Sequence, residues 1–152
     1  MTDDLQKEFV SRCEEDTARV AQWLADQMRG GEYVSLEGDL GAGKTLFARA
    51  FARALGIESA VTSPTFVLQK VYEVRGNAAG VTELAHYDFY RIGDYGELID
   101  MGFEDHDAGT VVLAEWGDLF VEEFARRAIR VRFVVVDDEV RRVVVVMPTT
   151  TS

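Results

Sequence analysis

The chain has 152 residues and a net charge of −11, from 27 acidic and 16 basic side chains. This length suits one domain with its own core, and the acidity argues against unaided tight binding to RNA or DNA, because polyanions are bound by neutralising their phosphates. No apolar run approaches the roughly 20 residues of a membrane-spanning helix, and the acidic N-terminus lacks the apolar region of a signal peptide. The single cysteine, Cys13, excludes an intrachain disulfide and a thiolate metal cluster. We therefore expect one cytoplasmic domain over residues 1–152, with protein partners and no membrane attachment.

The first third of the chain alternates strand and helix patterns. Acidic residues begin the first helical stretch, where they suit the positive end of the helix dipole, and glycines follow both helical stretches as stop signals. In chain order, the patterns predict an edge strand over 6–13, an amphipathic helix over 14–29, a short strand over 32–37 and a helix over 46–55.

The segment Gly38–Thr45, between the second strand and the second helix, satisfies the P-loop pattern G-x-x-x-x-G-K-[ST]. Its glycines let the backbone curl until several N–H groups point into one concavity, which binds phosphate together with the N-terminus of the following helix. In this motif the lysine, Lys44, reaches the β- and γ-phosphates and the hydroxyl of Thr45 holds Mg²⁺. The residues expected to bind the nucleotide here are Asp39, Leu40, Gly41, Ala42, Gly43, Lys44, Thr45 and Leu46.

Three residues in and beside this motif carry separate expectations. Leu46 stands where many P-loops have a second Ser or Thr, so a hydroxyl contact to the α-phosphate is missing while the backbone N–H remains. Glu37 and Asp39 flank the start of the loop, and their carboxylates would repel phosphate if they pointed inward. We therefore expect these two carboxylates to face solvent or to cap local amides.

The remainder of the chain mixes hairpins with a buried strand. The continuous apolar run over 111–114 is typical of a parallel strand, and the β-branched segments near the C-terminus indicate a hairpin. The predicted elements are strands over 67–74 and 81–87 around a turn at 76–80, a short helix over 94–101, the strand over 111–114, a helix over 118–127, strands over 129–136 and 141–147, and a frayed tail over 148–152. We predict a three-layer α/β P-loop NTPase fold whose mixed sheet has a parallel core and antiparallel additions.

Hydrolysis at a P-loop requires more than the loop, because Mg²⁺ needs acidic ligands at nearby strand ends. Glu115 follows the apolar run over 111–114 as the acid of a Walker B motif does, and Asp88 follows the strand over 81–87. We expect Lys44, Asp88 and Glu115 to be catalytic, and Thr45, Asp88 and Glu115 to hold the metal. The alternative for each carboxylate is a surface position at a strand end.

Further side chains allow two interpretations each. Ser63 and Thr65 offer hydroxyls in a segment that would sense the γ-phosphate as switch loops do, or belong to an ordinary proline turn. His86 is either a base or a packed, hydrogen-bonded histidine, and Arg91 either neutralises phosphate or pairs with a carboxylate. Trp116 packs over the nucleotide or in the core. For His106 the spacing reveals no partner.

Four motifs in this order and spacing resemble the bacterial threonylcarbamoyladenosine biosynthesis ATPases, the TsaE family (formerly YjeE). They are Gly38–Thr45, Ser63–Phe66, His86–Arg91 and Glu115-Trp116, and the resemblance covers nearly the whole chain. It implies an ATPase that binds ATP and Mg²⁺ and supports formation of threonylcarbamoyladenosine at position 37 of tRNAs that read ANN codons. This ATPase, whose activity would be weak, would act on the threonylcarbamoyl-transferase complex of TsaB- and TsaD-type proteins.

The resemblance also implies roles for individual residues. Lys44 would be the phosphate-binding lysine and Thr45 a Mg²⁺ ligand, with Asp88 and Glu115 as the acidic residues near the metal. Trp116 would be the tryptophan of the site, and Ser63 and Thr65 the switch-like segment. The chain departs from the family at Leu46, where threonine is usual, and at Gly117-Asp118, where proline or alanine often follows the tryptophan.

Two other function classes use the same loop. A small-molecule kinase needs an acceptor pocket and usually an arginine-bearing lid, and the sequence shows no obvious lid insertion. A nucleotide-gated interaction protein would need to bind the nucleotide, but its hydrolysis of that nucleotide would matter little. The lack of an N-K-x-D guanine motif, together with the resemblance, favours adenine.

Overall fold

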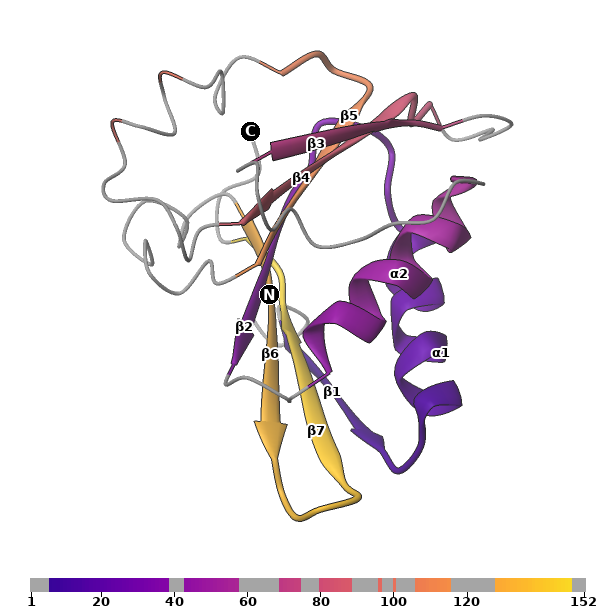
Figure 1. Cartoon of the computed structure of the whole chain (residues 1–152), viewed down its shortest axis with the longest axis vertical. Helices are drawn as coiled ribbons and strands as arrows, with labels where there is room; N and C mark the ends of the chain where they lie inside the picture. The colour runs from indigo at the N-terminus through magenta and orange to yellow at the C-terminus, as the bar shows by residue number, and fades with distance from the viewer. Residues whose placement is uncertain are drawn as a thin grey trace.

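The computed structural model describes residues 6–38, 43–57, 69–74, 80–88, 106–115 and 128–148, together with Gly96 and Asp100; the side chains of Gln69 and Asp88 are not described. Seven strands form one sheet, and the two described helices pack on the same face of it (Figure 1). The elements are β1 (Gln6–Ser11), α1 (Glu14–Ala25), β2 (Tyr33–Gly38), α2 (Lys44–Leu55), β3 (Gln69–Glu73), β4 (Glu83–Asp88), β5 (Thr110–Glu115), β6 (Ala128–Val135) and β7 (Arg141–Val146).

The strand order is β1-β7-β6-β2-β5-β4-β3. Strands β6, β2, β5 and β4 are parallel to one another and form the centre of the sheet. Antiparallel strands flank this centre, with β3 beside β4 on one side and β7 and β1 beyond β6 on the other. The prediction of a mixed sheet with a parallel core and antiparallel additions is therefore confirmed, and β1 is an edge strand as expected.

Helix α2 begins inside the P-loop motif, two residues earlier than the apolar pattern predicts. Gly43 precedes it in the left-handed region with φ of 107°, so the chain turns sharply and Lys44 is already helical. Gly56, with φ of 109°, ends the helix where the sequence predicts. Helix α1 ends at Ala25, before the expected position 29, and the chain continues as a turn that begins at Asp26.

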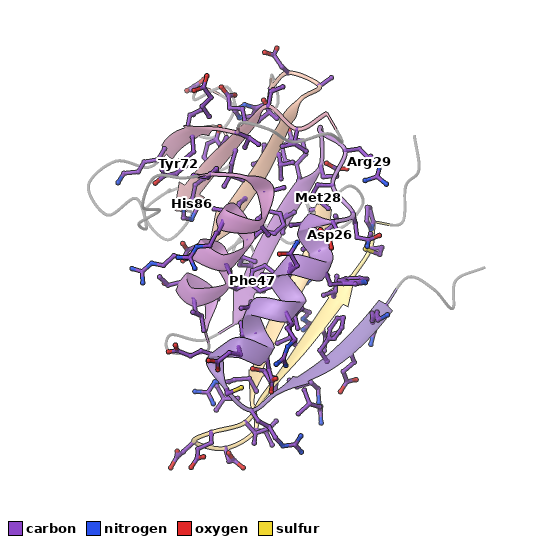
Figure 2. The ribbon with its side chains drawn as sticks, turned by 90° about the vertical axis from the view of Figure 1, so that its right-hand side faces the viewer. Asp26, Met28, Arg29, Phe47, Tyr72 and His86 are labelled. Carbon is purple, nitrogen blue, oxygen red and sulfur yellow. The ribbon has the colours of Figure 1, made fainter. Side chains whose placement is uncertain are left out.

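Alternation along the strands divides the sheet into two faces. Val34 and Leu36 of β2 and Leu113 of β5 belong to one buried cluster with Phe47 and Phe51 of α2, so they face the helices. Figure 2 looks onto these helices from outside, with the sheet behind them. The intervening residues of β2 face away from the helices. Side chains at alternate positions of β2 therefore have different neighbours.

The predicted helix over 118–127 lies outside the described residues, as do most residues of the predicted helix over 94–101 and of the turn at 76–80. In the part of the chain that the structure describes, no helix is long and apolar enough to cross a membrane.

Candidate functional site

The site is built at one edge of the sheet, where three neighbouring parallel strands end. Strand β2 ends at Gly38, the first residue of the P-loop motif, while β5 ends at Glu115 and β4 at Asp88. In the register of the sheet, Leu36 pairs with Glu115, and Glu115 pairs with Asp88. Because the carboxyl ends of parallel strands meet at the same edge, the start of the loop and the backbones of both acidic residues lie side by side.

Lys44 connects the two ends of the P-loop motif. Its side chain is buried, with 5% of the residue exposed, and its Nζ donates a hydrogen bond to the carbonyl oxygen of Gly38. The next residue, Thr45, is exposed in the first turn of α2. The first amides of a helix have no acceptor within the helix, so this turn combines an ammonium group, a hydroxyl and N–H donors in one place.

Gly38 is required by the close approach of two strands. Its φ is 138°, and a Cβ atom at this position would lie 2.7 Å from the carbonyl oxygen of Phe133 on β6. A side chain would therefore both strain the backbone and collide with it. This contact fixes the point at which the chain leaves the sheet and enters the loop.

Glu115 is buried and hydrogen-bonded to His86. The two side chains lie on the helix-covered face, and Oε2 of Glu115 is 2.7 Å from Nε2 of His86. Among the described residues, Nδ1 of His86 has no hydrogen-bond partner. The structure thus favours the packed, hydrogen-bonded histidine over a base. By holding one oxygen of the carboxylate, His86 restricts Glu115 to one orientation.

Glu37 corrects the expectation that it faces solvent or caps local amides. Only 4% of this residue is exposed, and its two carboxylate oxygens accept hydrogen bonds of 2.7 and 3.0 Å from Nε and Nη2 of Arg130 on β6. Ser35 donates to the same carboxylate at 3.3 Å. Arg130 lies on the strand beside β2 but far away in sequence, so local patterns could not indicate the pair. The bidentate contact joins β6 to the strand that carries the loop.

Breaking the Glu37–Arg130 pair is expected to destabilise the fold. We predict that Arg130→Ala lowers the free energy of unfolding by about 3–5 kcal/mol, because a buried carboxylate loses its partner. Arg132→Ala is the matched control, since Arg132 is 57% exposed in its side chain and 3.7 Å from the same carboxylate, and should cost less than about 1 kcal/mol. Urea denaturation measures both. Equal losses in the two variants would contradict the assignment.

A second histidine also has a partner that its spacing did not reveal. Nε2 of His106 is 2.7 Å from the hydroxyl oxygen of Tyr87, and the two rings meet edge to face with centroids 5.8 Å apart. Tyr87 is fully buried and directly precedes Asp88 on β4. The contact ties the segment before β5 to the end of β4, and so supports the strand end at which the site is built.

Several predicted site residues lie outside the described part of the chain. They include the loop residues Asp39, Leu40, Gly41 and Ala42, the hydroxyl residues Ser63 and Thr65, Arg91 and Trp116. The residues that the structure does bring to one region are Gly43, Lys44, Thr45, Leu46 and Glu115, with the backbone of Asp88.

Known proteins resemble this chain in sequence and in fold. The family described as "Threonylcarbamoyl adenosine biosynthesis protein TsaE" matches residues 11–143. The tRNA threonylcarbamoyladenosine biosynthesis protein TsaE of Streptomyces coelicolor is 40% identical over 127 residues, covering 80% of this chain and 84% of that protein. The protein of the same name from Treponema pallidum is 35% identical over 137 residues, covering 90% of this chain and 97% of that protein. The crystal structure of Bacillus subtilis YdiB matches with a TM-score of 0.69 and 30% identity, covers 93% of this chain and 85% of that one, and supports the P-loop NTPase-type fold. The chain therefore belongs to the TsaE family of tRNA threonylcarbamoyladenosine biosynthesis proteins.

Proposed function

We propose that this chain is a Mg²⁺-dependent ATPase that supports formation of threonylcarbamoyladenosine at position 37 of tRNAs that read ANN codons. It would act on the threonylcarbamoyl-transferase complex of TsaB- and TsaD-type proteins. The observation that carries the proposal is a buried lysine at the start of α2 that is bonded to the end of β2, where a buried glutamate ends the neighbouring strand β5. The names of the relatives supply the pathway.

The described residues fit a nucleoside triphosphate with a divalent cation. The ammonium group of Lys44 and the amides at the start of α2 offer positive charge to phosphate oxygens. The hydroxyl of Thr45 and the carboxylate of Glu115 are oxygen ligands of the kind that Mg²⁺ prefers, and Asp88, a third residue with such a group, ends the strand beside Glu115. When bound, the cation would neutralise charge that develops on the phosphates.

His86 would act through Glu115 and would not touch the nucleotide itself. The hydrogen bond of 2.7 Å fixes the carboxylate before any ligand arrives. A group that is held in place needs no reorganisation during the reaction, which is the main advantage of a preorganised site. The pair therefore supports a role for Glu115 in hydrolysis beyond that of a surface carboxylate.

The charge of the chain bears on its partners. A net charge of −11 disfavours direct capture of tRNA, whose backbone is also negative. In the proposed function the partner proteins hold the RNA, and this chain supplies ATP turnover. The cytoplasm, where tRNA and ATP are both present, is the compartment that this function requires.

The proposal is tested by measuring phosphate release from ATP by the purified chain. We expect slow hydrolysis that stops when EDTA removes Mg²⁺ and that rises when the transferase complex is added. Absence of phosphate release from ATP when both Mg²⁺ and the transferase complex are present would contradict the proposal. Transfer of phosphate to a small acceptor, faster than hydrolysis, would instead identify a small-molecule kinase.

A further inference from the structure

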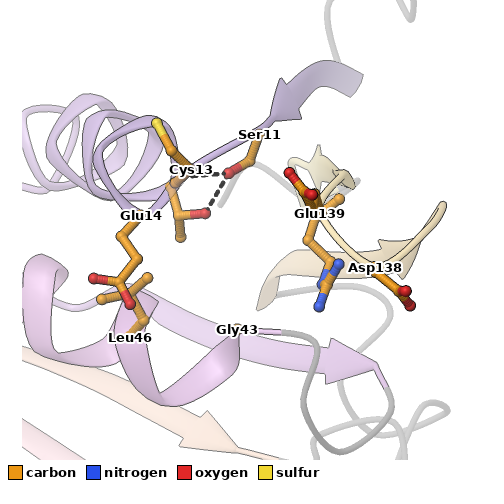
Figure 3. Close-up of a pocket in the computed structure, with 9 residues that line it drawn as sticks. Ser11, Cys13, Glu14, Gly43, Leu46, Asp138 and Glu139 are labelled. Atoms are coloured by element: carbon orange, nitrogen blue, oxygen red, sulfur yellow. Dashed lines mark hydrogen bonds between the residues drawn. The ribbon is translucent and has the colours of Figure 1, made fainter.

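Phe133 on β6 lies against the first and the last glycine of the P-loop motif. Its backbone pairs with Gly38, where β2 ends, in the register of β2 and β6. At the other end of the motif, a Cβ atom built on Gly43 would lie 4.0 Å from Cδ2 of the Phe133 ring. Figure 3 shows Gly43 at the start of α2, where it also lines a pocket between α1, α2 and the turn that joins β6 to β7. Phe133 thus meets the chain where β2 ends and again where α2 begins.

The contact at Gly38 does not depend on the aromatic ring. A Cβ atom at Gly38 would lie 2.7 Å from the carbonyl oxygen and 3.1 Å from the Cβ atom of Phe133, and both of these atoms remain when the ring is removed. The contact at Gly43 is made by the ring. Within the described part of the chain, Cδ2 is the one heavy atom within 4 Å of the Cβ position at Gly43, apart from atoms of its chain neighbours. A substitution at position 133 therefore changes the support of Gly43 and leaves the contact at Gly38 in place.

The Phe133 ring is held in the core next to the first turn of α2. Only 4% of the residue is exposed, and its ring meets that of Phe47 edge to face, with centroids 5.5 Å apart. Phe47 in turn stacks on Phe51, one turn further along α2, with centroids 6.0 Å apart. Aromatic rings that are buried in such pairs have few alternative positions, because a packed core leaves no space for them. The ring is therefore a rigid support.

Gly43 depends on this support because of its own conformation. Its φ of 107° lies in the left-handed region, which favours a residue without a side chain. A glycine has no side chain with which to pack against the sheet, so neighbouring residues must hold the backbone at this point. The next residue is Lys44, whose ammonium group donates a hydrogen bond to the carbonyl oxygen of Gly38. A shift of Gly43 would therefore move the lysine and the first amides of α2 together.

We propose that Phe133 is a positioning residue of the nucleotide site, whose ring fixes the start of α2 at the distance from β2 at which Lys44 and the helix amides bind phosphate. This inference rests on the proposed function, in which these groups hold the phosphates of ATP. Phe133 itself would not touch the nucleotide. Because a displacement of about 1 Å is enough to impair a binding group, a smaller side chain at this position should weaken nucleotide binding. A residue that served the core alone would affect stability without this effect.

Phe133→Leu and Phe51→Leu form a matched pair that separates the two roles. Both remove the same atoms from one aromatic cluster, but in the described part of the chain Phe51 does not lie against a glycine of the motif. We expect thermal melting to show that both variants are folded and destabilised to a similar extent. In isothermal titration calorimetry, Phe133→Leu should bind Mg-ATP about tenfold more weakly than wild type, and Phe51→Leu within about twofold of it. Mg-tripolyphosphate, which has no nucleoside, should lose affinity by the same factor as Mg-ATP, because the change acts on the phosphate-binding turn.

Steady-state hydrolysis adds a readout that a role in core packing would not move. We expect Phe133→Leu to raise KM for Mg-ATP about tenfold and to lower kcat less than about threefold, because Glu115 and its partner His86 are untouched. Wild-type affinity for Mg-ATP in folded Phe133→Leu, or an equal loss in Phe51→Leu, would overturn the role of Phe133 alone. If Phe133→Leu does not fold, Phe133→Met and Phe51→Met, whose flexible side chains fill irregular space, are judged by the same criteria. Failure of the wild-type chain to bind Mg-ATP would overturn the proposed function itself.

Discussion

Replacement of Lys44 by alanine is expected to weaken binding of Mg-ATP by about a hundredfold or more. The side chain is buried at the start of α2 and is the cation that joins the two ends of the motif. Alanine removes this charge and leaves the carbonyl oxygen of Gly38 without the ammonium donor. Isothermal titration calorimetry measures the affinity, and circular dichroism verifies that the variant is folded.

Arg53→Ala is the matched control for the Lys44 prediction. Arg53 is also a cation of α2, but it lies in the last turn of the helix and is exposed. Its removal changes the net charge by the same amount and should leave ATP affinity within about twofold, because exposed charges at this distance are screened. An ATP affinity of folded Lys44→Ala within threefold of wild type would contradict the assignment of this loop as the nucleotide site.

Replacement of Glu115 by glutamine is expected to separate binding from hydrolysis. The glutamine has nearly the same shape, so packing against His86 is kept while the negative charge is lost. We expect ATP affinity to change less than fivefold and the rate of hydrolysis to fall by about 10²–10³-fold, the usual size of an effect from one electrostatic group. Single-turnover measurement of phosphate release gives the rate without interference from product release.

Glu83→Gln is the control for this second prediction. Glu83 begins β4, at the opposite end of the parallel strands, and accepts a hydrogen bond of 3.1 Å from Thr110. This variant tests whether loss of any carboxylate from the parallel strands slows turnover, and we expect it to hydrolyse ATP at the wild-type rate. Hydrolysis by Glu115→Gln at the wild-type rate would remove Glu115 from the catalytic residues. Loss of ATP binding in step with hydrolysis would make it a binding residue instead.

The parallel core and the loop at its edge were predictable because their signals are local. The apolar run over 111–114 lies within β5, whose residues are all buried, as expected for a strand covered on both sides. The P-loop pattern predicted that Gly38–Thr45 lies between a strand and a helix. The early start of α2 was missed because apolar spacing does not register the left-handed turn at Gly43.

The side-chain pairs of the site were not predictable, since each joins residues that meet only after strands have paired. Glu37 and Arg130 are 93 positions apart, and His86 and Glu115 are 29 apart. Their contacts depend on β6 and β5 lying on either side of β2 and on β4 lying beyond β5. A single sequence does not specify this order. For Glu37, no local pattern indicates Arg130 as the partner of the buried carboxylate.

The central claim is that nucleotide binding at this loop supports threonylcarbamoyladenosine formation. Its most direct test is to deplete the protein in cells, restore either the wild-type chain or Lys44→Ala, and measure threonylcarbamoyladenosine in bulk tRNA. We predict that the modification falls on depletion, returns with the wild-type chain and fails to return with Lys44→Ala expressed at the same level. Unchanged modification after depletion, or full recovery with Lys44→Ala, would contradict the claim.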